Sequence, residues 1–347
     1  MADLVLARRT SVSISFGGTD ITSDIKPYLL KLTYTDDEDD QTDDLKIELQ
    51  DRDGLWLEHW LKEAVETAAG GKLSISAVIT LENWMKTGAL KTGAFELDSV
   101  SASGPPAKVT IGSTSLAFSS SLRQTKKSRA WENYTLSGIA AEIASGGGMS
   151  SLYESSFDPS YTRVEQTKQS DIDFLKKLCQ NAGISLKATD GKIVLYDQAT
   201  YEAKAPVLTI EKGAKGGYIS YAVSSGSADT QYSKCRVRYM DLATGTCIEG
   251  TAEDGDVSGD QCLEITAKVS SVGEAQTLAK KHLRLHNKLA KTAVFTLPGD
   301  VGLVAGVTVQ LKGWGGWDGK YIITRATHTV GSGGYTTQIR MRKVLSY

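Results

Sequence analysis

Short stretches in the first hundred residues alternate apolar and polar side chains with a period of two, and this pattern restricts the fold more than any other feature. The clearest stretches are SVSISF, YLLKLTYT, LKIELQD, KLSISAVITL and GAFELDSV. In LKIELQD the apolar side chains of Leu45, Ile47 and Leu49 share one face. Strands with one apolar face build antiparallel sheets that are covered on one side. Glycines at 17–18, 70–71 and 88 are expected to supply turns.

Segments with helical periodicity are few and lie mainly in the middle of the chain. A short helix is expected over residues 55–67, between strands. Thr135 precedes the apolar stripe of LSGIAAEIASGGG, and Ser170 opens a second helix that Gly183 ends in the left-handed conformation. ISLKAT and KIVLYD then form a hairpin around Asp190-Gly191. These elements predict a small α/β unit over residues 119–204.

The C-terminal third is again rich in strands, with one long helix. A capping box at Ser271 and Glu274 opens that helix, which is expected over residues 272–290. AVFTL, GVTVQLKG, GKYIITRATHTV and YTTQIRMRKVL follow as strands. A chain of 347 residues is too long for one compact core.

We therefore expect an α+β fold, mainly β, in three parts. A first β-barrel or sandwich occupies residues 1–118 and is completed by strands near 205–223. The α/β unit at 119–204 is inserted after it, and a second antiparallel β-barrel at 205–347 carries the long helix. The two β units are of similar size, as a diverged duplication would be.

Charge and composition argue against several broad classes of protein. Lys and Arg number 39 against 41 Asp and Glu, a net charge of −2, whereas a dedicated nucleic-acid binder needs a basic surplus. No apolar run approaches the roughly 18 residues that span a membrane, and the N-terminal residues lack the apolar core of a secretion signal. Cys179, Cys235, Cys247 and Cys262 are widely spaced, which favours reduced thiols in a cytoplasm.

Two motifs resemble metal sites without matching them. His282 and His286 are four residues apart on the predicted long helix, so they share a face, but LRL stands between them where a zinc protease has its glutamate base. Residues 254–260 (DGDVSGD) imitate the start of a calcium loop, with Gly259 at the sixth position. The twelfth position, which needs an acid, falls on Ile265. A surface helix and a solvated turn explain these motifs better.

Residues 36–44 (DDEDDQTDD) hold seven acids in nine positions. Such a run usually stays solvated because its charges repel one another, and as a cation site it is unconvincing. Inside a tube, a negative wall would let DNA slide past without binding. The sequence does not decide whether this run faces a channel or binds a cation.

Nucleophilic and cofactor motifs are poor. His59 and His328 lie beside no Cys or G-x-S-x-G elbow, and KGAKGG and GWGGWDG do not match a phosphate-binding loop. Without a basic groove, packing explains the tryptophans better than base stacking; they are Trp56, Trp60, Trp84, Trp131, Trp314 and Trp317. We expect no enzyme activity, and therefore no catalytic residue, no cofactor-binding residue and no metal ligand.

Several stretches together resemble the late control gene D family of phage tail proteins. The N-terminal stretch is YTDDEDDQTDDLKIELQDRDGLW, and GAFELDSVSASGPPAKVTIGSTS is similar to the family's Gly-x-Phe-x-Leu/Ile-Asp strand followed by Gly-Pro-Pro. LRQTKKSRAWENYTLSGIAAEIA and QSDIDFLKKLCQNAGISLKATDGKIVL resemble its two helix segments. AGVTVQLKGWGGWDGKYIITRATHTVGSGGYTTQIRMR resembles its closing barrel. In this order, the segments cover nearly the whole chain.

This resemblance implies a structural baseplate hub protein of a contractile phage tail. It implies two tube-like β-barrels per chain and a homotrimer, whose pseudo-sixfold ring joins a sixfold tail tube to a threefold spike and lines the channel. The implied partners are a trimeric tail spike protein, a tail tube or tube-initiator protein, and baseplate wedge and tape measure proteins, with DNA only as passing cargo. The chain would be made in the host bacterial cytoplasm and reside in the virion tail baseplate.

Three alternatives stay open at this point. A hub of a tailocin or type VI-like injection apparatus would share the architecture. A tail-associated cell-wall hydrolase would need a metal or an acid–base pair, for which only His282 and His286 are weak candidates. A small-ligand binding module on a β-barrel would be a monomer with an apolar pocket.

Overall fold

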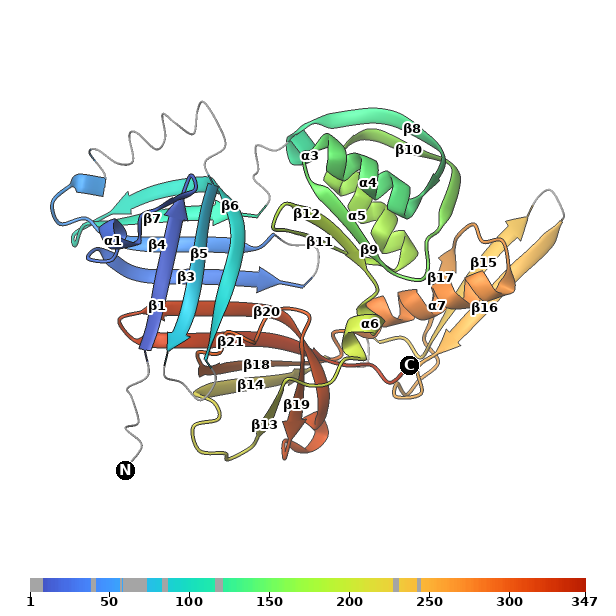
Figure 1. Cartoon of the computed structure of the whole chain (residues 1–347). Coiled ribbons are helices and arrows are strands. Elements are labelled where there is room, and N and C mark those ends of the chain that lie inside the picture. Colours follow the sequence, from blue (N-terminus) through green and yellow to red (C-terminus); the bar gives the residue numbers. More distant parts are fainter. Residues whose placement is uncertain are drawn as a thin grey trace.

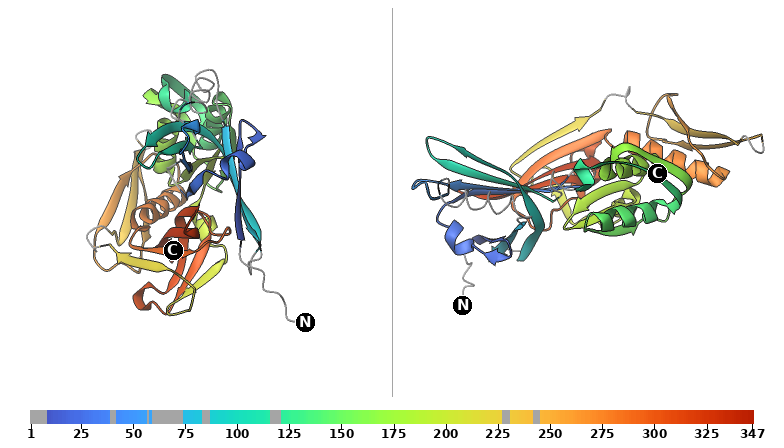
Figure 2. Two further views of the ribbon diagram at one scale, coloured as in Figure 1. Left: turned by 90° about the vertical axis from the view of Figure 1, so that its left-hand side faces the viewer. Right: turned by 90° about the horizontal axis from the view of Figure 1, so that it is seen from above.

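The structure is a computed structural model of the whole chain, and it describes residues 9–38, 42–56, 58, 74–82, 87–115, 121–226, 231–241 and 245–347. The molecule is elongated, with the N-terminal strands at one end and a C-terminal strand pair at the other, as Figure 2 shows. None of the helices in these ranges has both the length and the apolar character needed to cross a membrane. Most of residues 55–67 lies outside these ranges, so the helix expected there stays a prediction.

The first β unit consists of the N-terminal strands and a short helix. Its strand β4 (Asp44–Gln50) shows why the alternating pattern matters, because Leu45, Ile47 and Leu49 are buried while Lys46 faces solvent. The other elements of this unit are β1 (Arg9–Phe16), β2 (Thr19–Asp20), α1 (Thr22–Ile25), β3 (Leu29–Asp37), β5 (Ser74–Glu82), β6 (Gly88–Ser103) and β7 (Lys108–Thr114).

The second β unit contains the C-terminal strands. It comprises β13 (Leu208–Glu211), β14 (Ser220–Ser225), β18 (Lys291–Pro298), β19 (Thr308–Lys312), the short helix η3 (Gly315–Trp317), β20 (Gly319–Gly331) and β21 (Gly334–Lys343). Its core is centred on Phe295, Tyr321 and Ile339. Because β20 pairs with β3, the two β units form one continuous 13-stranded sheet in the order β14-β18-β21-β20-β3-β4-β7-β6-β5-β1-β2, with β13 and β19 off this path (Figure 1).

This topology corrects one expectation. The strands near 205–223 do not complete the first β unit, because β13 pairs with β19 and β14 pairs with β18. Their apolar residues Ile210 and Val223 pack into the core of the second β unit, which explains the pairing. The strand order of the described residues is an open path, and closure of the two β units into tube-like barrels stays a prediction.

The insert, α3 to α6, lies within the expected residues 119–204 and has its own core around Trp131 and Phe174. The predicted caps are confirmed: Thr135 caps α4, Ser170 caps α5, and Gly183 ends α5 with a φ of 62°. Asp190-Gly191 turns between β11 and β12, as predicted. The elements of the insert are α3 (Ser121–Gln124), β8 (Lys126–Thr135), α4 (Leu136–Gly146), β9 (Ser150–Glu154), β10 (Ser160–Ser170), α5 (Asp171–Ala182), β11 (Ser185–Thr189), β12 (Lys192–Tyr196) and α6 (Gln198–Glu202).

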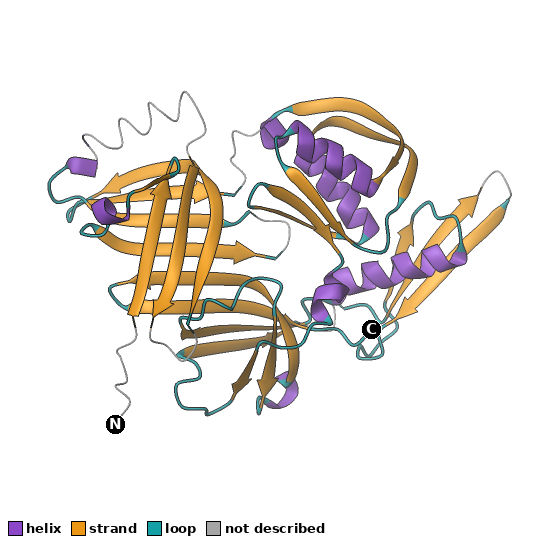
Figure 3. Ribbon diagram, in the orientation of Figure 1, coloured by secondary structure: helices purple, strands orange, loops and turns teal. Residues whose placement is uncertain are grey.

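The long helix belongs to a fourth part rather than to the sheet of the second β unit. This part, called the α7 unit, comprises β15 (Lys234–Asp241), β16 (Thr246–Glu253), β17 (Cys262–Thr266) and α7 (Val272–Asn287). Its strands form a separate sheet with a separate core under α7, and Figure 3 shows the helices confined largely to α7 and the insert. A Cβ atom at Gly250 would lie 2.3 Å from the backbone nitrogen of Gln276, so glycine permits this close packing.

The cap of α7 confirms its predicted start. Ser271 accepts a hydrogen bond from the backbone N–H of Glu274. The Glu274 carboxylate accepts in turn from the backbone N–H of Ser270, one residue before the expected partner. The helix ends at Asn287, three residues before the expected end.

Candidate functional site

The acidic run of residues 36–44 lies where the first β unit meets the insert and the second β unit. β3 ends in this run, beside the β11–β12 hairpin and the middle of β20 (Figure 1). Asp36, Asp37, Glu38 and Asp43 are all buried, and residues 39–41 are outside the described ranges. Buried carboxylates need compensating charges, since desolvation of an unpaired ion costs several kcal/mol.

Lys187 of the insert compensates two of these carboxylates. Its Nζ pairs with Oδ1 of Asp36 and lies 3.3 Å from Oδ1 of Asp43. Burial lowers the pKa of Lys187, but the two carboxylates together outweigh that effect, so its pKa is raised overall. Burial, with the charge of Asp36, raises the pKa of Asp43 to about 6 despite Lys187. One lysine thus serves two acids, and Asp43 is the less fully compensated.

Two arginines of the second β unit compensate the remaining carboxylates. Arg325 donates from Nε to Asp37 Oδ1 at 2.6 Å. Arg342, which is 1% exposed, places Nη2 3.3 Å from Glu38 Oε1 and Nη1 2.7 Å from Glu202 Oε1. Glu202 of α6 also pairs with Arg284 of α7. These ion pairs tie all four parts of the molecule together, and we call them the charged junction.

The structure corrects both interpretations for four of the seven acids in this run; Asp44 is exposed and Asp39 and Asp40 lie outside the described residues, so for these three the interpretations stay open. The four buried carboxylates are neither solvated nor available to the wall of a channel, and the cations that they meet are lysine and arginine side chains. The separations along the chain are 151 residues for Lys187–Asp36, 288 for Arg325–Asp37 and 304 for Arg342–Glu38. No local pattern in the sequence reveals partners so far apart.

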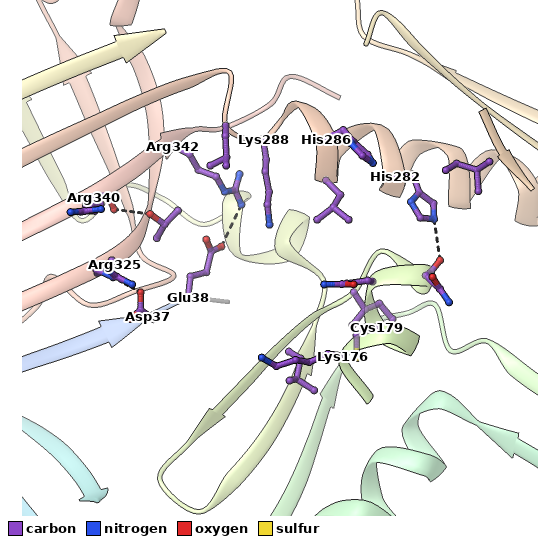
Figure 4. Close-up of a pocket in the computed structure, with 18 residues that line it drawn as sticks. Asp37, Glu38, Lys176, Cys179, His282, His286, Lys288, Arg325, Arg340 and Arg342 are labelled. Atoms are coloured by element: carbon purple, nitrogen blue, oxygen red, sulfur yellow. Dashed lines mark hydrogen bonds and ion pairs between the residues drawn. The ribbon is translucent and has the colours of Figure 1, made fainter. Parts of the chain in front are cut away.

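A cavity of about 860 Å³ opens beside the charged junction. One wall comes from α5 and another from α7, and the middle of β20 and the end of β21 complete it (Figure 4). Both candidate metal ligands, His282 and His286, line this cavity.

The two histidines have other partners in the structure. His282 Nε2 donates to the backbone oxygen of Asn181 at 3.1 Å, and burial lowers the pKa of this histidine. The ring of His286 meets Tyr232 edge-on, with centroids 5.6 Å apart. Within the described ranges, no three His, Cys, Asp or Glu side chains converge as metal ligands would. The four cysteines are free thiols.

The loop that imitates a calcium site has a structural partner instead. Asp254 is buried, and its Oδ2 accepts from Asn287 Nδ2 at 2.8 Å, at the end of α7. Its Oδ1 accepts from the backbone N–H of Asp256 at 3.0 Å. The carboxylate thus fixes the loop to the helix.

His328 belongs to β20, and its side chain lies in the core. It is fully buried, and its Nε2 donates to the backbone oxygen of Leu303 at 3.0 Å. Its Nδ1 accepts from the Tyr335 hydroxyl at 2.7 Å. Burial lowers the pKa of His328 to about 4, so the ring is neutral at pH 7. His59 lies outside the described residues.

The tryptophans that the structure describes are packing residues, as predicted. Trp131 stacks on Phe174, Trp56 meets Tyr28 edge-on, and Trp314 packs against Phe295. Trp317 packs at the margin of the second core. Trp60 and Trp84 lie outside the described residues.

Comparison with known proteins then decides the family. The family model described as phage tail baseplate hub (GPD) matches residues 117–334, more than half of the chain. The chain belongs to this family. Its function is that of a phage tail baseplate hub, a component of the virion tail, and the resemblance read from the sequence is confirmed.

Individual relatives and structures agree with the family. The probable baseplate hub protein of Escherichia phage 186 is 22% identical over 96% of this chain and 92% of its own length. The tail protein from Neisseria meningitidis MC58 has a TM-score of 0.68 at 12% identity, covering 96% of both chains. The E. coli c3393 protein, a type VI secretion component described as similar to phage T4 gp27 and gp5, has a TM-score of 0.55 at 12% identity, covering 97% of this chain and 77% of its own.

Proposed function

We propose that this hub is a homotrimeric, non-enzymatic adaptor of a contractile tail. It joins the sixfold tail tube to the threefold spike and lines the channel between them. The observation that carries this proposal is the pair of antiparallel β units joined through β3 and β20 in one chain. Three such chains present six β units, so a threefold ring can match a sixfold one.

A ring of this kind needs strand edges at which neighbouring copies can pair. Among the described strands of the main sheet, β14 and the second half of β6 offer such edges. β14 pairs with β18 alone among the described strands. β6 pairs with β5 up to Glu96 and with β7 from Glu96 to Ser103, so within the described ranges residues 97–103 have no strand partner on the β5 side. Open edges of this kind invite pairing with another chain.

Pairing of β14 from one copy with the second half of β6 from the next would extend the sheet across the subunit border. Such a head-to-tail contact closes into a ring when the rotation permits it. Ile219, which precedes β14, is 60% exposed, and Tyr221 within it is 49% exposed. Exposed apolar side chains beside an open strand edge favour a protein contact there.

The mass of the purified chain tests this proposal. Wild type should sediment as a trimer, alone or with tail tube and spike proteins. Ile219→Glu should shift the population toward monomer because it places a charge in the proposed border. Met240→Glu is the matched control, since Met240 is also exposed (52%) but lies in the α7 unit.

The outcomes separate the two parts of the proposal. A wild-type monomer under all assembly conditions would contradict the adaptor. A trimer that Ile219→Glu leaves intact would contradict the β14 border while the adaptor stands.

The fold also fits the hub of a tailocin or type VI-like apparatus, since c3393 shares it. The same trimer would serve there, and the neighbouring genes distinguish these systems. In either case we propose synthesis in the host bacterial cytoplasm, with wedge and tape measure proteins as further contacts and DNA only as passing cargo.

A further inference from the structure

The main sheet has one face that points away from its apolar cores, and both β units contribute to it. Side chains that stand opposite one another on neighbouring strands form two rows across this face, on strands that run side by side in Figure 1. The first row, from β4 to β14, is Asp44, Thr35, Thr327, Gln338, Thr296 and Ser220. The second row, from β6 to β21, is Ser99, Gly112, Lys46, Thr33, Thr329 and Thr336. We call these two rows the hydroxyl face, because most of their members are threonine or serine.

The strand alternation separates this face from the cores. Leu45 and Ile47 flank Lys46 on β4 and are buried, and Tyr34, between the two threonines of β3, is buried as well. All members of the hydroxyl face are exposed or half-buried. Asp44 and Lys46 are its charged members, and their charges cancel. Asp44 is also the exposed acid of the run at residues 36–44.

Other exposed strand surfaces of the chain have a different composition. The outer face of the α7 unit carries Arg236, Arg238 and Glu249, and the β8–β10 pair carries Glu132 and Arg163. Charged side chains on such surfaces oppose unwanted association of sheets. The hydroxyl face is broader than either of these surfaces, yet it lacks their density of charge. Its composition is therefore unlike that of the chain's outer strand surfaces.

The hydroxyl face is equally unlike a subunit interface. The core of a protein interface is enriched in aromatic residues, methionine and arginine and is depleted in serine. The two rows contain no aromatic residue, no methionine and no arginine. A surface that suits neither the exterior nor a protein contact suits an enclosed space filled with water, where hydroxyl groups stay hydrated.

We propose that the hydroxyl face is the wall of the channel and that a DNA duplex passes it without being held. DNA affinity depends mainly on cations that neutralise phosphates, and this face offers one lysine balanced by one aspartate. Because β3 pairs with β20, the face continues from the first β unit into the second. Three copies would close it into one continuous wall. The inference rests on the proposed hub role, since without a ring there is no channel.

Cysteine accessibility in the purified full-length chain tests the placement. Lys46→Cys and Gln338→Cys each introduce a thiol at an exposed position of the hydroxyl face, one in each β unit. The exposed native Cys247 on β16 serves as the outer standard in every sample. Loss of each unmodified cysteine peptide is followed by mass spectrometry during reaction with N-ethylmaleimide and, separately, with a maleimide attached to a bulky polyethylene glycol.

In trimers, we expect the introduced cysteines to react with N-ethylmaleimide as readily as Cys247 does. With the bulky maleimide they should react at least tenfold more slowly than Cys247, because the channel restricts its entry. Thr251→Cys is the matched control, since Thr251 is exposed on β16. It should react with both reagents at the rate of Cys247.

A charge substitution tests the relation to DNA. In a trimer, Gln338→Lys places three additional positive charges around the channel, where their fields add. We expect it to bind a short fluorescein-labelled DNA duplex at least tenfold more tightly than wild type at low salt, as measured by fluorescence anisotropy. Thr251→Lys makes a similar change of charge on the α7 unit and should stay close to wild type. Equal affinities of the two lysine variants would overturn the proposal.

Mass measurement on the same samples keeps this proposal apart from the adaptor. Trimers whose introduced cysteines react with the bulky reagent as fast as Cys247 would refute the channel wall alone. Trimers whose introduced cysteines react with neither reagent would place the face in a protein contact and would also refute the wall alone. A chain that stays monomeric under all assembly conditions would contradict the adaptor, and the channel wall with it.

Discussion

The charged junction and the outer face of the α7 unit both contain pairs of arginine with a carboxylate, but the junction buries these pairs and the outer face exposes them to water. On the outer face, Arg236 lies 3.3 Å from Glu249 and 3.5 Å from Glu264, and Arg238 lies 3.2 Å from Glu249. These side chains are 37–61% exposed, whereas Glu38 and Arg342 in the junction are below 5%. Water can replace a lost partner on the outer face but not in the junction.

This difference teaches what each set of charges does. Cross-strand pairs on a solvated face add little stability and keep an exposed sheet soluble. A buried network adds little net stability either, but it strongly disfavours any arrangement in which its partners separate. The junction therefore specifies how the four parts of the hub sit together.

The largest effect is expected from Arg342→Met. This change leaves Glu38 and Glu202 buried without their common cation, and we expect the free energy of unfolding to fall by about 3–5 kcal/mol. Urea unfolding followed by tryptophan fluorescence would measure the loss. A loss below about 1 kcal/mol, the range of an exposed pair, would contradict the claim that the buried pairs differ from the exposed ones.

Lys187→Met should cost about 3 kcal/mol at pH 7, because Asp36 and Asp43 then face each other without a cation. The folded-state pKa of Asp43 is raised to about 6, so this acid favours folding at low pH and loses that contribution as the pH rises through 6. The defect of Lys187→Met should accordingly shrink at pH 5. The double variant with Asp43→Asn should recover much of the lost free energy of unfolding at pH 7. If it recovers none, the uncompensated charge of Asp43 is not the cause of the defect.

His328 extends the comparison of buried and exposed charges to a buried group that stays neutral. Its folded-state pKa, about 4, is depressed below the ordinary 6.5, so its stabilising contribution is complete above pH 6.5 and is lost as the pH falls toward 4. We expect it to lower stability by about 2 kcal/mol between pH 7 and pH 5. His328→Gln retains a donor and an acceptor, and in parallel thermal unfolding it should show that much less dependence on pH. Identical pH profiles would contradict this prediction.

Arg238→Met should have the smallest effect, within about 0–1 kcal/mol. Any difference from wild type should vanish in 1 M salt, where the screening length is about 3 Å. Parallel urea titrations at low and high salt would measure it. A salt-independent loss of several kcal/mol would show that exposure does not separate the two regions.

Elements defined by neighbours in sequence were predictable. The helix α5 starts at the cap Ser170 and ends at Gly183, and the β11–β12 hairpin turns at Asp190-Gly191, as the sequence indicated. Each depends on hydrogen bonds and dihedral angles within a few residues. Strand alternation was equally reliable, because it depends only on which face of a sheet is covered.

Assignments that required knowing which strands meet were not predictable. The strands β13 and β14 follow the insert, but they joined the second β unit instead of the first. The helix α7 was placed on the second β-barrel, although it covers a separate three-stranded sheet. Edge pairing depends on the shape of the assembled core, which no single strand contains.

The sequence by itself determined the mainly β class, the insert with its capped helices and, through the order of several motifs, the baseplate hub family. Only the tertiary structure decided that the acids of residues 36–38 and 43 are buried and that basic residues from the insert and the last two strands of the main sheet compensate them. The physical reason is range. Turns, caps and alternation are decided by adjacent residues, whereas the environment of a charge is decided by side chains that folding brings from 151 to 304 positions away.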